Sequence, residues 1–563
     1  MASSSPNPAL VTRRAARRLP RWALLMLAAA YLLPGVFGRD PWRNADLVAY
    51  AHMAAIAEGR SGWLVPTLGG VAGDAALLPN WLGALAIRAL SPFVDPAVAA
   101  RLPFVLLLAG TFALVWYATY RLARTEAAQP VAFAFGGEAA PVDYARAVAD
   151  GGLLALMATL GLLQLGHETT PELMQLFGVS LYLWALASAP FRVGRARAAG
   201  IAALVILAAS GAPSMASALG IAGIAVCAFS RVAGVRRLAP WIAAATALAG
   251  LVASRIGAWQ LRTEALDGTV LLAIARQWLW FLWPSWLLAL WTLWRWRDHL
   301  GHHHLTVPIS AVAVALLSNL AMGGSDRALL LGLPALSVLA AFALPTLKRS
   351  TSAAIDWFSM FFFTGCALTI WVIYAAVQTG VPPRPAANVQ RLAPGFVAHF
   401  SLPELLLAAA ASLAWIALVR WRTGRHREAV WKSMVLPAGG VALCWLLLMT
   451  LWLPLLDYVR SSRALVERVA IHVAPGSCIA SPGLSPVLVA ALETLGPYRV
   501  DARASAASSA CDTRIEVMAA AAASGATAPP GWRLAGTAQG PRDRDDALAI
   551  YHRVQPAAAT PAR

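Results

Sequence analysis

The stretch GRDPWRNADLVAYAHMAAIAEGRSGWLVPTLGGVAGDAALLPNWL, residues Gly38 to Leu82, directly follows the first apolar segment of the chain. Most of it, from Arg39 to Trp81, is too polar to cross a bilayer, and its apolar residues are spaced too regularly for an irregular connecting loop. Between Asp46 and Glu58, apolar residues recur at mostly helical spacing, which predicts a short helix lying on the membrane surface. Carboxylates held at the boundary between membrane and water suit a reaction between a group in water and a group carried by a lipid. The alternative interpretation is a connecting loop with solvated charges.

The composition identifies the class of protein. The chain has 563 residues, of which 59% are hydrophobic and only 13% are charged, and its mean hydropathy is +0.63. Soluble domains carry about a quarter charged residues, so these values indicate an integral membrane protein. The net charge is +18, but the arginines fall in short clusters between apolar runs. That is the pattern of cytoplasmic loops in membrane proteins, and it argues against nucleic acid as a partner.

The apolar runs predict an α-helical protein with about thirteen transmembrane helices, at about twenty residues for each crossing. Residues 1–21 form a basic tail that stays in the cytoplasm, and residues 22–37 form a first span that is not cleaved. The transmembrane region extends over residues 22–455 and includes a periplasmic first loop at 39–101. With this count, the clustered arginines face the cytoplasm, and residues 456–563 lie in the periplasm beside a bacterial inner membrane.

Residues 456–563 alternate helical and strand-like segments. This pattern predicts a small periplasmic α/β domain, with strands at 478–480, 498–500, 515–518 and 549–554. Cys478 and Cys511 lie in this region. The periplasm is oxidising, so the two cysteines are candidates for a disulfide bond. The alternative is a pair of buried thiols.

Several short motifs, taken in order, resemble those of one family. The motifs are D46-L-V-A-Y50, W63-L-V-P-T-L-G-G-V, P79-N-W-L, Ala100-Arg101-Leu102-Pro103, and Ser325-Asp326-Arg327 followed by Leu333-Pro334-Ala335-Leu336. They resemble GT-C membrane glycosyltransferases, in particular the lipid A aminoarabinose transferase and protein O-mannosyltransferase-like groups. Asp46 and Tyr50 match the first Asp and the Tyr of the family pattern, whereas Leu47 stands where a second acid is usual. Asp74 stands near the later acidic turn, without the usual adjacent Lys.

The resemblance implies a transferase that takes a sugar from a polyprenyl-phosphate-linked donor. The acceptor would be lipid A, another glycan or a protein at the periplasmic face. Such a reaction needs a base for the acceptor, cations for the departing lipid phosphate and a groove for the lipid tail.

The resemblance assigns the base to Asp46, although an aspartate at this point is also a chemically sensible helix N-cap. Glu172 is a further candidate acid. A carboxylate at the end of a transmembrane helix costs free energy unless it faces water, a charged or hydrogen-bonding partner, or a functional site. Asp40 is a supporting acid. His167 and Glu168 could hold a divalent cation together with Glu172, but their spacing matches no recognised metal site, so no metal ligand is assigned.

Arg327 is the first candidate for binding the donor phosphate, since arginine pairs with phosphate through two parallel hydrogen bonds. Arg101 and Arg43 are further candidates, and Asp326 is a neighbour of the site. The alternative for each arginine is an interfacial side chain that reaches lipid headgroups.

Two other functions fit parts of the sequence. A transporter or flippase of lipid-linked sugars would also have many spans and few charges, but the internal repeat common in such proteins is not visible. A scaffold with this fold and no activity is the second alternative, and Leu47 in place of an acid keeps it open.

Overall fold

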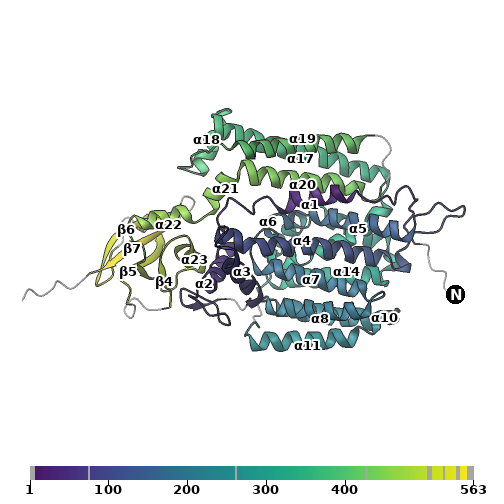
Figure 1. Cartoon of the computed structure of the whole chain (residues 1–563), viewed down its shortest axis with the longest axis horizontal. Coiled ribbons are helices and arrows are strands. Elements are labelled where there is room, and N and C mark those ends of the chain that lie inside the picture. The colour runs from purple at the N-terminus through teal and green to yellow at the C-terminus, as the bar shows by residue number, and fades with distance from the viewer. Residues whose placement is uncertain are drawn as a thin grey trace, which may run out of the picture.

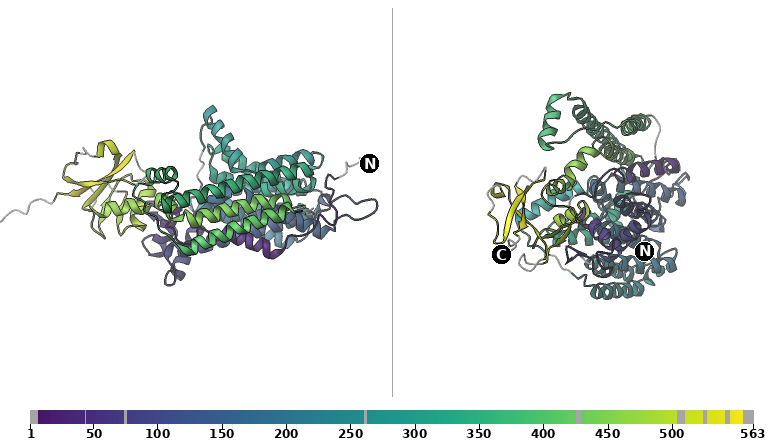
Figure 2. Two further views of the ribbon diagram at one scale, coloured as in Figure 1. Left: turned by 90° about the horizontal axis from the view of Figure 1, so that it is seen from above. Right: turned by 60° about the vertical axis from the view of Figure 1, so that its left-hand side comes forward.

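The computed structural model describes residues 7–42, 44–73, 76–259, 263–424, 429–503, 510–523, 527–540 and 545–554. A long helical bundle makes up most of this part of the chain. A sheet formed by C-terminal residues lies at one end of the bundle, and the N-terminus lies at the opposite end (Figure 1, Figure 2). The short helices α2 and α3 lie between the bundle and the sheet (Figure 1).

The bundle is built from helices that follow the apolar runs of the sequence. Its first half contains α1 (Arg21–Leu32), α4 (Pro96–Ala123), α5 (Pro141–Ala158), α6 (Leu160–Leu165), α7 (Pro171–Ser188), α8 (Val193–Ala209), α9 (Pro213–Ala228), α10 (Ala233–Arg236) and α11 (Ala239–Arg255). Its second half contains α12 (Gly268–Phe281), α13 (Ser285–Arg295), α14 (His303–Ala321), α15 (Asp326–Leu330), α16 (Leu333–Ala343), α17 (Arg349–Thr379), α18 (Pro383–Leu392), α19 (Leu402–Thr423), α20 (Lys432–Leu451) and α21 (Leu453–Arg460).

Among the described residues, six helices have the length and composition to cross a membrane, namely Pro96–Ala123, Ala233–Arg255, His303–Ala321, Arg349–Thr379, Leu402–Thr423 and Lys432–Leu451. Shorter apolar helices, α1 and α9 among them, pack beside these six. Such helices are those of a multi-pass membrane protein. The count of about thirteen crossings and the side that each end faces stay predictions.

Two of the long apolar runs of the sequence are each made of two helices. The run at 151–165 breaks at Thr159, between α5 and α6, and the run at 271–294 breaks between α12 and α13. The two breaks contact each other, because the Leu160 amide donates to the Trp283 carbonyl at 3.0 Å and the hydroxyls of Thr159 and Ser285 lie 2.7 Å apart. Backbone groups released from a helix inside a membrane must find partners within the protein, and each break supplies partners for the other.

Helix α2 (Ala45–Ala57) differs from the expected surface helix. It packs against α3 (Leu77–Leu90) and against α23 (Pro486–Thr494), and most of its side chains are buried. Leu47 is completely buried in an apolar cluster that includes Val489 and Ile550. The prediction of a membrane-surface helix is therefore wrong, because C-terminal residues cover α2.

A hairpin of two short strands follows α2. Strands β1 (Thr67–Leu68) and β2 (Val71–Ala72) are antiparallel, and Gly69 and Gly70 join them with φ angles of +57° and +74°. A Cβ atom on Gly69 would lie 2.8 Å from Val489, so glycine is needed there both for the backbone angle and for the close approach. The Gly69 carbonyl accepts a hydrogen bond from the Ala502 amide at 3.0 Å, which joins the hairpin to the C-terminal residues.

The C-terminal residues form a five-stranded mixed sheet in the order β4-β3-β5-β7-β6. Its strands are β3 (Cys478–Ala480), β4 (Arg499–Asp501), β5 (Thr513–Ala519), β6 (Trp532–Ala538) and β7 (Asp546–Arg553). Strand β3 is parallel to both of its neighbours, and β7 is antiparallel to both of its own. The helices of this region are α22 (Arg463–Ala470), α23 and α24 (Ala520–Ala523). Cys478 and Cys511 are joined by a disulfide bond, with their Cα atoms 4.9 Å apart.

Candidate functional site

Arg327 and two glutamates form an ion-pair cluster near the connections that precede α7 and α16. The Arg327 guanidinium donates from Nη2 to Glu168 Oε2 at 2.7 Å and from Nη1 to Glu172 Oε2 at 2.8 Å. Nη1 also donates to the Thr170 hydroxyl at 3.1 Å. Ser325 caps the short helix α15, on which Arg327 lies, and Glu172 lies in the first turn of α7. The cluster is partly exposed, so water or a ligand can reach the guanidinium.

A cavity of about 290 Å³ opens beside this cluster. Arg327, Glu172 and Gln175 contribute charged and amide side chains to its lining. Hydroxyl-bearing residues also line it, namely Ser210, Ser214, Thr263, Ser318 and Ser325. A guanidinium among amide and hydroxyl groups suits a ligand that combines an anionic group with hydrogen-bonding hydroxyls.

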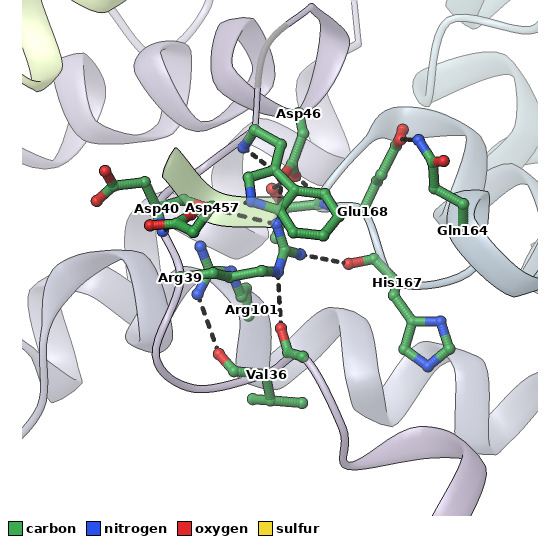
Figure 3. Close-up of polar contacts among 12 residues, drawn as sticks. Val36, Arg39, Asp40, Asp46, Arg101, Gln164, His167, Glu168 and Asp457 are labelled. Atoms are coloured by element: carbon green, nitrogen blue, oxygen red, sulfur yellow. Dashed lines mark hydrogen bonds and ion pairs between the residues drawn. The ribbon is translucent and has the colours of Figure 1, made fainter. Parts of the chain in front are cut away.

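Asp46 forms a second, fully buried cluster (Figure 3). Its Oδ2 accepts from Arg39 Nη1 at 2.9 Å and from the Trp42 amide at 3.1 Å, and its Oδ1 accepts from the amide and the hydroxyl of Thr169 at 2.8 and 2.7 Å. The N-cap position of α2 is occupied by Asn44, so the N-cap interpretation of Asp46 is wrong. The carboxylate instead joins the start of α2 to the segment before α7.

The two clusters meet in three successive residues. Glu168 and Thr170 contact Arg327, while Thr169 between them holds Asp46. Asp46 itself does not line the cavity beside Arg327. The segment 168–170 is therefore the physical connection between the predicted base and the predicted phosphate ligand.

The pKa values of Asp46 and Glu168 are shifted in opposite directions. Burial raises the pKa of Asp46, but Arg39, Arg101 and the hydrogen bonds from Thr169 outweigh it and lower that pKa from 3.8 to about 2. Burial also raises the pKa of Glu168, and there the opposing charge of Arg327 does not cancel the effect. Asp46 is thus held firmly as an anion, and Glu168 takes up a proton more readily than an ordinary glutamate.

The low pKa of Asp46 predicts a pH-dependent contribution to stability. A carboxyl group with a depressed pKa stabilises the folded state above its unfolded pKa, and the contribution is lost as the pH falls through the folded value. For Asp46 it amounts to roughly 2 kcal/mol at neutral pH, and it disappears between pH 3.8 and about 2. We therefore expect the gap in melting temperature between wild type and Asp46→Asn to be widest near neutral pH and to narrow steadily below pH 3.8. Thermal unfolding in detergent measures this gap, and a gap that stays constant in acid would contradict the prediction.

His167 and Asp40 have partners that the sequence did not indicate. The ring nitrogens of His167 lie 2.6 Å from the Leu163 carbonyl and 2.8 Å from the Tyr31 carbonyl, so the ring is held by the backbone. Among the described residues, no three His, Cys, Asp or Glu side chains are grouped so that they could hold a metal ion. Asp40 accepts from the Ser461 hydroxyl at 2.7 Å and from Arg463 Nε at 2.8 Å, so it lies at the junction with the C-terminal residues.

Arg101 lies near Asp46 and is buried. Its Nη1 donates to the Val36 carbonyl at 3.0 Å, and its Nη2 has no hydrogen-bond partner in the described part of the chain. The guanidinium stabilises the Asp46 carboxylate by its charge, and it does not line the cavity at Arg327.

Known proteins match this chain in fold rather than in sequence. No family model and no curated sequence matches it. Two crystal structures of ArnT from Cupriavidus metallidurans do match: the one bound to undecaprenyl phosphate with a TM-score of 0.57 at 14% identity, and the apo state with a TM-score of 0.55 at 13% identity. Each alignment covers 94% of this chain and 98% of the other. The chain has the ArnT fold. The predicted resemblance to the lipid A aminoarabinose transferase group is thus confirmed at the level of the fold.

Of the remaining predicted residues, Tyr50 and Asp326 are described, and neither lines the cavity at Arg327. Tyr50 lies on α2, half-buried against the bundle core. Asp326 begins α15 and accepts from Gln277 Nε2 at 3.1 Å. Arg43 and Asp74 lie outside the described residues.

Three residues that hold the site were not among the predicted ones. Arg39 stands in the first loop, but no motif assigns it a role. Asp457 lies far along the chain, yet it accepts from the Asp40 amide at 2.9 Å and from Trp42 Nε1 at 3.0 Å. Thr169 carries no charge that would single it out. It had one local signal, because hydroxyl-bearing residues just before a proline often mark the start of a helix.

Proposed function

We propose that this chain transfers a sugar from a polyprenyl-phosphate-linked donor to an acceptor on the outer side of the membrane. In this reaction the acceptor oxygen bonds to the anomeric carbon, and the bond from that carbon to the phosphate oxygen breaks. The polyprenyl phosphate leaves with the bonding electrons, and the acceptor proton passes to a carboxylate. The observation that carries the proposal is a partly exposed guanidinium, that of Arg327, on a cavity rich in hydroxyl groups.

Arg327 binds the departing phosphate in this proposal. Its two terminal nitrogens, which now bind Glu168 and Glu172, have the geometry that two phosphate oxygens require. A phosphate that enters the cavity competes with these carboxylates for the guanidinium. Glu172, which lines the cavity, then remains as a second carboxylate beside the reacting groups.

Asp46 is the base in this proposal, and donor binding makes it accessible. Glu168 is released when phosphate takes over Arg327, and Glu168 is covalently adjacent to Thr169, which donates both of its hydrogen bonds to Asp46 Oδ1. Movement of the segment 168–170 therefore uncovers the carboxylate. Loss of these two donors also raises the pKa of Asp46 from about 2 toward its ordinary value, which makes it a stronger base. Without a donor the base stays covered.

Mass spectrometry of the envelope lipids and glycans tests the reaction. We expect a strain that lacks this chain to lose one sugar from a surface acceptor and to accumulate the corresponding lipid-linked sugar. Purified chain in vesicles should then transfer that sugar from the accumulated lipid to acceptor from the same strain. Movement of the intact lipid-linked sugar across the vesicle membrane without transfer would establish the transporter instead. An unchanged envelope would contradict both.

A further inference from the structure

A groove with a strongly basic lining lies at the end of the bundle opposite the sheet. It has a volume of about 410 Å³ and is formed where α17 begins, α19 ends and α20 begins. These three helices lie side by side (Figure 1). Neither the cavity at Arg327 nor the proposed reaction involves this groove.

Three cations line the groove, one from each helix: Arg349, Arg422 and Lys432. Its one acidic lining residue, among those the structure describes, is Asp356, which forms an ion pair with Arg422. The pair fixes the direction of the Arg422 side chain. Arg349 and Lys432 also stand in the first turns of α17 and α20, where the backbone itself favours an anion. The positive charge of the groove therefore favours an anionic ligand.

An apolar surface continues from the groove along α17. Trp357 lines the groove and is 57% exposed, and Phe361, one turn further, is 67% exposed. Their rings stack at a centroid distance of 5.5 Å. Phe358 and Phe362 extend the exposed aromatic surface of the same helix. A free inorganic anion would make no use of this surface, whereas an acyl chain would lie along it.

We propose that this groove binds the headgroup of an anionic phospholipid, whose acyl chains lie along the exposed aromatic face of α17. Basic pockets between transmembrane helices on the cytoplasmic side are suited to such headgroups. The sequence predicts that this end of the bundle faces the cytoplasm, because its arginines are clustered there. A lipid held here would join α17 and α19, which are the least buried of the long helices, to α20 in the core.

Native mass spectrometry of the full chain in detergent, titrated with phosphatidylglycerol, tests this proposal. We expect the double variant R349Q/K432Q to weaken phosphatidylglycerol binding by about thirtyfold, since each cation near a phosphate contributes about a factor of five. The matched control is R195Q/R236Q, which removes two exposed arginines outside the groove and gives the same net charge. The control should bind as the wild type does, and R349K/K432R should also retain binding.

The other outcomes are equally decisive. Equal weakening by R349Q/K432Q and its control, or equal binding of phosphatidylcholine by the wild type, would overturn the proposal, because either result indicates general adsorption. Displacement of the lipid by millimolar inorganic phosphate would show a free-phosphate site and would also overturn it. If R349Q/K432Q does not fold, Trp357→Ala replaces it. That variant leaves the cations in place and should still weaken lipid binding, and unchanged binding would contradict the proposal.

Discussion

Replacement of Arg327 by glutamine is expected to lower the rate of sugar transfer by about 10²–10³-fold, which is the usual effect of removing one donor that stabilises a developing negative charge. Glutamine cannot offer two charged donors to the leaving phosphate. The variant also leaves Glu168 and Glu172 without their common cation, so the two carboxylates repel the donor phosphate. Transfer in vesicles from the lipid-linked donor measures the effect.

Two further variants make this result specific. Arg327→Lys keeps the charge but loses the paired geometry, so we expect an intermediate rate. Arg384→Gln removes an exposed arginine on α18, away from the cavity, and should leave transfer unchanged. Full transfer by Arg327→Gln would show that the phosphate binds elsewhere and would remove the main support for the proposed site.

Replacement of Asp46 by asparagine is expected to abolish most transfer, with a loss of about 10²–10⁴-fold, because asparagine cannot take the acceptor proton. The same change removes the charge that pairs with the buried Arg39. An unpaired buried charge costs about 3–5 kcal/mol, so the variant should also melt at a lower temperature. Transfer and thermal unfolding are therefore measured on the same preparations.

A double-mutant cycle separates the two effects. Arg39→Gln alone should lower stability, and the pair D46N/R39Q should recover part of that stability because both charges of the buried Arg39–Asp46 pair are then removed together. Transfer should not recover in the pair if Asp46 is the base. Recovery of transfer together with stability would show that Asp46 only holds the segment 168–170. Asp512→Asn, a change at an exposed carboxylate near β5, serves as the control.

Thr169 links these two predictions in physical terms. Its amide and hydroxyl keep Asp46 charged and covered, while its neighbour Glu168 holds Arg327. In the proposed mechanism, donor binding at Arg327 exposes the Asp46 carboxylate through this link. Water would then be kept from the base until the donor is in place.

The composition and the apolar runs by themselves determined the membrane class and the mostly helical fold. Apolar segments of this length have no stable place except in a bilayer or a large core, so their location can be predicted from local sequence alone. The motifs around Asp46 and Arg327 indicated the ArnT-like fold. They too can be read from local sequence, because each motif is continuous in the chain. Strand β6 was not predicted, because its residues show no clear alternation and follow an alanine-rich segment.

The tertiary structure alone decided the surroundings of the site. The sequence of α2 fits a surface helix, and it is buried only because residues more than four hundred positions later fold over it, as the cluster of Leu47 with Val489 shows. The partners of Asp46 and Arg327 meet in the segment 168–170, which is distant from both in sequence. Such contacts depend on how whole helices pack, and no local pattern of residues encodes that packing. The sequence therefore indicated candidate residues for the chemistry, and the fold decided which of them face the cavity.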